Sequence, residues 1–214
     1  RLFADRPFVR ASLTSIIGFA AAAGFFYVAP QYLRSIRGES ALEAGIFLLP
    51  LAIAALASAQ LSGRIVAAGR AGQDLVAGGV VMAVGSVMLL LWSDGSLWVV
   101  AAAFIVFGFG YGLLNDPLSV EELASLPGSE AGLASSLFST SKQTGQLFGI
   151  AAVGTILSAA SPDFAPAYRD VGGWGWAALV VCGVAVSALN VPSLGSRAKP
   201  IRTPTITTPD GPSR

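Results

Sequence analysis

A row of polar side chains runs along one otherwise apolar stretch of the sequence, residues 131–160. Five of them lie at offsets 0, 4, 7, 8 and 11, which place them on one face of an α-helix. Such a face is costly against lipid and is typical of a bundle interior or a water-filled path. Its hydroxyl, amide and ammonium groups suit contacts with a small polar or amphipathic molecule. The five residues are Ser135, Ser139, Lys142, Gln143 and Gln146.

Lys142 is the most informative residue of this face, because it is the one that carries a charge. It follows the predicted start of its helix by about 11 residues, which is roughly 16 Å along the axis. An ionisable group at that depth predicts contact with a substrate or with a carboxylate of another segment. We favour this lining role over the alternative that the polar groups only join helices by hydrogen bonds. Asp116, by contrast, is expected near the interface as an ordinary acid at a helix end.

The composition excludes several other kinds of site. The 214 residues include no histidine and one cysteine, Cys182, so zinc, haem and His-assisted nucleophile sites lack their most common member. We therefore expect neither a metal site nor a cofactor. A formal net charge of +1 gives no excess of positive charge of the kind that binds nucleic acid. Only 12% of the residues are charged, against roughly 25% in soluble domains, so water is not expected around most of the surface.

Six apolar runs of about the length that a membrane crossing requires divide the sequence. Lipid offers no partner for a free backbone N–H or C=O group, so each run must be helical. The predicted fold is all-α: a polytopic bundle of six transmembrane helices over residues 11–194, with a lead-in at 1–10 and a disordered tail at 195–214. The predicted spans are residues 11–33, 44–62, 75–92, 97–114, 131–160 and 171–191.

Basic residues in the connections predict the orientation, because they favour the cytoplasmic side. One side would hold Arg1, Arg6, Arg10, Arg64, Arg70, Arg197, Lys199, Arg202 and Arg214, and the other Arg34, Arg37 and Arg169. Both termini are thus expected in the cytoplasm, with the chain in a plasma or inner membrane. Six aromatic residues near helix ends predict an interfacial belt on the outer side: Tyr27, Tyr32, Trp92, Trp98, Trp174 and Trp176.

Small residues and prolines mark points of helix packing and bending. Gly108 and Gly112 form a GxxxG pair, and Gly145 and Gly149 repeat it, which predicts close approach of helix backbones. Pro50 lies inside the second predicted span and is expected to permit a kink.

Two stretches carry a family resemblance. Residues 32–50 read YLRSIRGESALEAGIFLLP, and residues 132–149 read GLASSLFSTSKQTGQLFG. In this order they resemble the stretches YLQ..xG.SpleAGl.lLP and aGlAsgl..t.rQ.Gg..G of the fourteen-span drug/proton antiporters of the major facilitator superfamily. The resemblance covers residues 8–194 and implies the C-terminal six-helix half of such a transporter. The N-terminal half is then a partner that lies outside this sequence.

The resemblance also implies an activity, namely export of small amphipathic molecules by alternating access around a midplane site. The proton gradient would supply the energy, and the family's proton-carrying acid generally lies in the other half. Lys142 stands where the family often has Arg before Gln, which keeps the charge but loses bidentate hydrogen bonding. The loop with Gly63, Arg64 and Arg70 is similar to the family's gating loop. Its usual acid and base are replaced by Ala67 and Ala68.

Two alternatives remain open at this point. A non-transporting membrane subunit or scaffold would share the six helices, although the polar face argues against it. An intramembrane hydrolase would need Lys142 to activate Ser139 or Ser141, and neither pair lies in a recognisable catalytic motif. We therefore expect a transporter and not an enzyme.

Overall fold

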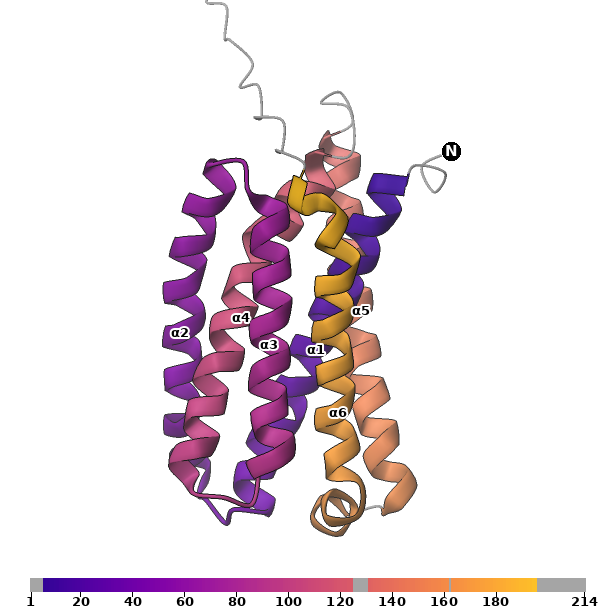
Figure 1. Ribbon diagram of the computed structural model, residues 1–214. Helices are drawn as coiled ribbons and strands as arrows, with labels where there is room; N and C mark the ends of the chain where they lie inside the picture. The colour runs from indigo at the N-terminus through magenta and orange to yellow at the C-terminus, as the bar shows by residue number, and fades with distance from the viewer. Residues whose placement is uncertain (1–5, 125–130, 162, 196–214) are drawn as a thin grey trace, which may run out of the picture.

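Six long helices make up almost all of the described chain. The computed structural model describes residues 6–124, 131–161 and 163–195, and it contains no strand in these ranges. Figure 1 shows the helices standing side by side as one bundle. They are α1 (Arg6–Ser35), α2 (Ala41–Ala67), α3 (Ala71–Trp92), α4 (Leu97–Ala124), α5 (Ala131–Ala160) and α6 (Phe164–Asn190), followed by a 3₁₀ turn, η3 (Val191–Gly195).

Local chemistry sets the ends of α2. Ser40 accepts a hydrogen bond from the Glu43 backbone N–H at 3.3 Å, and the Glu43 carboxylate accepts one from the Ser40 N–H at 2.8 Å. This capping box satisfies two backbone donors that the first helical turn leaves free. Gly38 and Gly69 have φ angles of 77° and 74°. They allow the chain to turn sharply before and after α2, because glycine adopts this conformation without steric cost.

Each predicted span falls on one helix, except that the last residue of the sixth span, Val191, lies in η3, and most of the helices are longer than their spans. The largest difference is in α4, which continues through Pro117 to Ala124. Five helices of the described chain are long and apolar enough to cross a membrane, namely α1, α2, α3, α4 and α6. The 30-residue α5 is also long enough, but the polar residues of its first half lower its hydropathy. The chain is therefore an all-α, multi-pass membrane protein.

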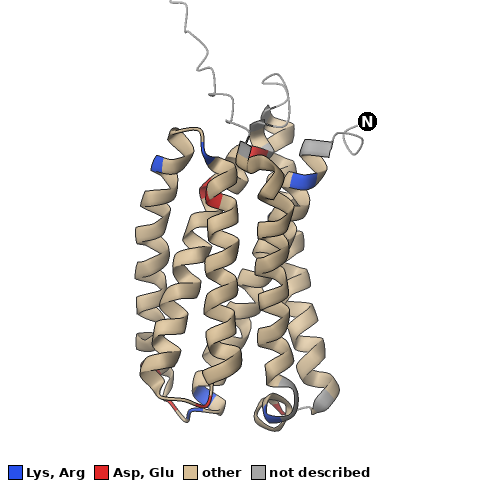
Figure 2. Cartoon of the chain, viewed as in Figure 1, with Lys and Arg blue, Asp and Glu red and all other residues tan. Residues whose placement is uncertain are grey.

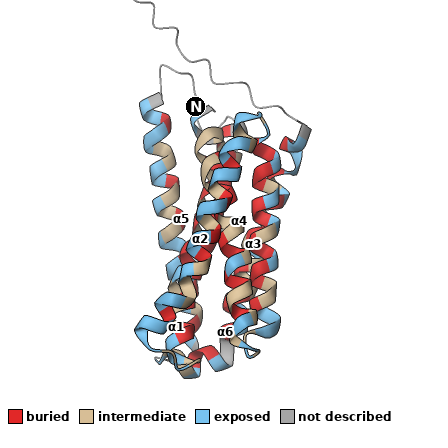
Figure 3. Ribbon diagram, turned by 90° about the vertical axis from the view of Figure 1, so that its left-hand side faces the viewer, coloured by how far each residue is buried: buried red, intermediate tan, exposed pale blue. Residues whose placement is uncertain are grey.

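The helices occupy central and flanking positions. The most extensive contacts join α3 to α4, α2 to α4, α1 to α5 and α3 to α6. Of the most apolar window of α1, 67% is buried inside the bundle, against 22% for α2. Figure 3 shows many exposed residues along α2 and α5 and many buried ones along α3. Thus α2 flanks α4 on one side, as α5 flanks α1 on the other.

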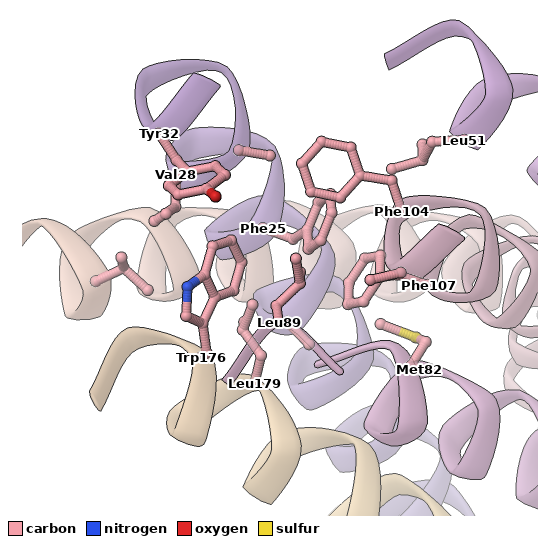
Figure 4. Close-up of a cluster of buried hydrophobic side chains, with 14 of the residues drawn as sticks. Phe25, Val28, Tyr32, Leu51, Met82, Leu89, Phe104, Phe107, Trp176 and Leu179 are labelled. Atoms are coloured by element: carbon pink, nitrogen blue, oxygen red, sulfur yellow. The ribbon is translucent and has the colours of Figure 1, made fainter. Parts of the chain in front are cut away.

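An aromatic cluster fills the centre (Figure 4). The Phe25 ring stacks on Phe107 with centroids 3.8 Å apart and meets the edge of Phe104 at 5.3 Å. These rings join α1 to α4, and Trp176 extends the cluster to α6, with its centroid 5.9 Å from that of Phe25. Aromatic pairs in such geometries contribute about 0.5–1.5 kcal/mol beyond their buried area.

The prediction of an interfacial belt is wrong for Tyr32 and Trp176, which are 0% and 1% exposed. Their polar atoms find partners inside the protein, because the Trp176 Nε1–H donates to the Tyr168 hydroxyl at 2.7 Å and the Tyr32 hydroxyl donates to the Ser93 carbonyl. The position of a residue near a helix end therefore does not show whether its ring faces the membrane interface or the interior of the bundle. Trp92, Trp98 and Trp174 are exposed on the bundle surface.

Glycines bring the flanking helices against the central ones. A Cβ atom at Gly145 or Gly149 of α5 would collide with the backbone carbonyl oxygens of Ile16 and Ala20 in α1. Gly108 and Gly112 of α4 lie equally close to the backbone of α2, at Leu51 and Ala55. Both GxxxG pairs thus lie where two helix backbones touch, which is the packing that this spacing allows.

Replacement of Gly149 by alanine tests the contact between α1 and α5. We expect Gly149→Ala to destabilise the protein by about 1–3 kcal/mol, because the added methyl group overpacks against the Ala20 carbonyl. Gly45→Ala is the matched control, since no atom lies within 4 Å of its Cβ position and alanine favours a helix by about 1 kcal/mol over glycine. Thermal unfolding of the purified protein measures both. Equal melting temperatures for the two variants would contradict the contact.

Candidate functional site

The polar face of α5 lies beside its contact with α1. Ala134, Gly145 and Gly149 are buried against the bundle. The predicted site residues follow along the edge of this buried strip: Lys142 and Gln146 are half-buried, and Ser135, Ser139 and Gln143 are exposed. The structure therefore brings the five residues to one edge of the bundle that its own helices leave uncovered.

Lys142 has an aromatic partner on the neighbouring helix. Its Nζ atom lies 4.8 Å from the centroid of the Phe19 ring of α1, and Phe138 meets the same ring edge-on at 6.1 Å. A cation over an aromatic face gains about 0.5–2 kcal/mol, with the larger values at desolvated sites. The sequence left two partners for Lys142 open, a substrate or a carboxylate of another segment, and among the described residues Lys142 forms no ion pair. Phe19 thus holds the ammonium group and leaves its N–H donors available.

Lys142 is distinctive because the other described charges lie near the two ends of the bundle, as Figure 2 shows for the side facing the viewer. One end carries the ion pair between Arg10 and Glu121, with N and O atoms 4.0 Å apart. At the other end Arg37 donates a hydrogen bond to the Gly95 carbonyl at 2.8 Å. An ionisable group between these ends is expected to serve a function.

The predicted gating residues lie where α2 passes into α3. Arg64 is in the last turn of α2, and Arg70 precedes the first turn of α3. Both side chains are exposed and line a cavity of about 350 Å³. Gly63 lies close to Asp116 of α4, since a Cβ at Gly63 would be 3.5 Å from its Oδ2 atom. Pro50 is half-buried in the interior of α2, and the kink there stays a prediction.

Asp74, in the first turn of α3, is a residue that the sequence analysis missed. It lines the same cavity, yet its side chain is 1% exposed. Its Oδ2 atom accepts a hydrogen bond from the Ser62 hydroxyl at 2.5 Å, while its Oδ1 atom has no hydrogen-bond partner. Asp74 directly precedes the third predicted span, so the sequence placed it in a loop. The one feature of the sequence that could have pointed to Asp74 is its hydrogen-bond partner Ser62, a polar residue at the end of the second predicted span.

The pairings proposed for an intramembrane hydrolase gain no support from these positions. Ser139 is exposed and Ser141 is buried, so they lie on different sides of α5. The Lys142 ammonium group is directed over the Phe19 ring.

Comparison with known proteins identifies the family to which this chain belongs. The family model of the Major Facilitator Superfamily matches residues 1–150. The chain belongs to the Major Facilitator Superfamily. The equivalent packing of α2 on α4 and of α5 on α1 agrees with the repeated three-helix units of this superfamily.

Several curated proteins are similar in sequence. The multidrug efflux pump LfrA of Mycolicibacterium smegmatis is 31% identical over 163 residues, which cover 74% of this chain and 32% of LfrA. The multidrug resistance protein Stp of Mycobacterium tuberculosis is 27% identical over 158 residues, 74% of this chain and 29% of Stp. A tetracenomycin C resistance and export protein of Streptomyces glaucescens is 26% identical over 155 residues, 72% of this chain and 29% of that protein. The chain therefore spans about a third of the length of these relatives.

Cysteine labelling tests whether the polar face of α5 meets water. In a Cys182→Ser background, we expect Gln146→Cys to react with a water-soluble thiol reagent and Phe148→Cys to stay unreactive. The two positions lie at nearly the same depth but on opposite faces of α5. Phe148 is 65% exposed on the bundle, so lipid and not protein must protect it. Equal labelling of both cysteines would contradict a water-filled path along the polar face.

Proposed function

We propose that this chain is the C-terminal six-helix half of a proton-coupled exporter of small amphipathic molecules. The observation that carries the proposal is the uncovered polar face of α5, with Lys142 held at mid-bundle over the Phe19 ring. The names of LfrA, Stp and the tetracenomycin C protein support drug export as the activity. Alternating access would expose this face to each side of the membrane in turn.

The other six-helix half is the proposed cover of this face. Both flanking helices, α2 and α5, leave large apolar side chains exposed, among them Leu42 and Ile53 of α2 and Leu147 of α5. A second bundle across these two flanks would enclose the polar face of α5 and form the midplane cavity. The small-molecule substrate would then lie between the two halves, with apolar walls around it.

Lys142 and the neighbouring amides would orient the substrate in this cavity. Lys142 offers N–H donors and a positive charge, while Gln143 and Gln146 offer both donors and acceptors. Ser135 and Ser139 add hydroxyl groups toward the start of α5. A few placed polar groups in an otherwise apolar pocket suit an amphipathic ligand.

The proposed orientation places both termini in the cytoplasm of a cell with this transporter in its plasma membrane. Arg64 and Arg70 would then lie at the cytoplasmic end, where they line the cavity between α2 and α3. The proton gradient would supply the energy, without a bound cofactor or metal. A non-transporting subunit or scaffold would not need the polar face, and an enzyme would need a nucleophile and base that this face does not bring together.

Replacement of Lys142 tests the substrate-contact role. We expect Lys142→Ala in the full-length transporter to weaken export by about tenfold, because one lost interaction of about 1.4 kcal/mol changes affinity by that factor. Membrane abundance should stay the same, and Lys142→Arg should retain much of the export. The measurement is drug accumulation in cells that lack other exporters. Phe148→Ala, on the opposite face of α5, is the control, and unchanged export by Lys142→Ala would refute the role.

Reconstitution tests the proposed activity as a whole. We expect vesicles that contain the full-length transporter to release protons when an exported drug is added outside, because drug that enters is exchanged for protons that leave, at a rate that depends on the drug concentration. A pH-sensitive dye inside the vesicles reports this flux. A transporter that binds the drug but moves no protons would contradict proton coupling, and a protein that does neither would favour the scaffold.

A further inference from the structure

A buried carboxyl group at the Arg64–Arg70 end of the bundle has no role in the function proposed above. Asp74 is 1% exposed, and its one hydrogen bond comes from the Ser62 hydroxyl to Oδ2. Its Oδ1 atom has no hydrogen-bond partner. The Ser62 hydroxyl also lies 3.3 Å from the Leu113 carbonyl oxygen of α4. Two helices thus enclose an acid whose second oxygen is unsatisfied.

The charged groups around Asp74 do not form an ion pair with it. The end of α2 contributes Arg64, and the residue before α3 contributes Arg70. Both side chains are exposed, and neither comes within 4 Å of the Asp74 carboxylate in the described structure. From α4 comes Asp116, another acid. The end of α6 and η3 contribute Asn190 and the Ser193 hydroxyl, with no charged residue in the described range.

Physical chemistry favours a proton on this acid. An ionised carboxylate that is buried without a cation carries a large desolvation cost, and a second carboxylate nearby adds repulsion. The amino-terminal end of α3 and the Ser62 hydroxyl offset a part of this cost. They leave Oδ1 unpaired, and protonation removes the charge.

We propose that Asp74 is a proton-binding site of this half of the transporter, and that Arg64 and Arg70 are the alternative counter-charges when the proton leaves. In the conformation described, Oδ1 holds the proton. When either guanidinium moves inward through the cavity that both arginines line with Asp74, the O–H bond breaks, its electron pair stays on Oδ1, and a water molecule in the cavity takes the proton. The proposal depends on the proposed function only for the use of this proton in transport.

A metal ion is a less suitable occupant. No group of three or more His, Cys, Asp or Glu side chains that could hold a metal gathers in the described part of the chain. Asp74 of α3 and Asp116 of α4 make two acids, which is fewer than the three ligands that such a group requires. A proton needs only one acceptor oxygen, and Oδ1 is that oxygen.

Infrared difference spectroscopy of the intact transporter in nanodiscs tests the site without substrate or gradient. Spectra at acidic and alkaline pH should show loss of a protonated-carboxyl band on alkalinisation, and Asp74→Asn should abolish this band. Ser62→Ala should shift its frequency, since the Ser62 hydroxyl binds the same carboxyl group. In the double variant Arg64→Gln, Arg70→Gln, the protonated-carboxyl band should persist at the alkaline pH, because the counter-charges for the ionised carboxylate are gone. Asp94→Asn, an exposed acid at the opposite end of the bundle, is the control and should leave the band unchanged.

The outcomes separate this site from the transport function. A band that survives in Asp74→Asn overturns the proposal, as does a band that Ser62→Ala leaves at its original frequency. The second variant keeps the test valid if Asp74→Asn does not fold. A sodium-dependent change in the carboxylate bands of the wild type that Asp74→Asn abolishes would also overturn it, because a metal cation would then be the occupant. Failure of drug-driven proton flux with an intact Asp74 band would refute only the proposed function.

Discussion

The direct contact between helix backbones at the glycine pairs is the constraint on which the bundle depends. Gly145 and Gly149 let α5 rest on the carbonyl oxygens of Ile16 and Ala20, and Gly108 with Gly112 gives the equivalent contact between α4 and α2. Lipid surrounds such helices as readily as protein does, so close van der Waals packing must hold them together. These contacts fix α2 and α5 as flanks of a core that α1 and α4 form.

The position of α5 decides what its polar residues can do. Because the glycines direct one edge of α5 against α1, Lys142 comes to lie over the Phe19 ring, and the rest of the polar face stays open. The aromatic partner keeps the ammonium group in place without neutralising it. The other described charged residues lie toward the two ends of the bundle. At one end, Asp74 and the two arginines of the α2–α3 connection form a second polar centre. The two centres would serve substrate contact and proton binding.

Much of the fold follows from the sequence, and the misses have identifiable physical causes. Apolar length located all six helices, and helical periodicity placed Lys142 and Gln146 on one face. Periodicity does not say which neighbour a face meets, so Tyr32 and Trp176 were placed at the membrane interface although they are buried. Hydropathy also ends a span at the first polar residue, which left Asp74 outside α3 and ended the fourth span before Pro117. Nothing in this sequence describes the partner half that would cover α5.

The central claim is that the polar face of α5 lines a substrate path between this bundle and a second one. The most direct measurement is an electron cryomicroscopy structure of the intact transporter with an exported drug bound. The account predicts that the drug lies against Lys142 and Gln146, with α2 and α5 facing the other bundle and α3 and α6 facing lipid. A structure in which the polar face of α5 packs without a cavity against other helices, or faces lipid while the drug binds elsewhere, would contradict it.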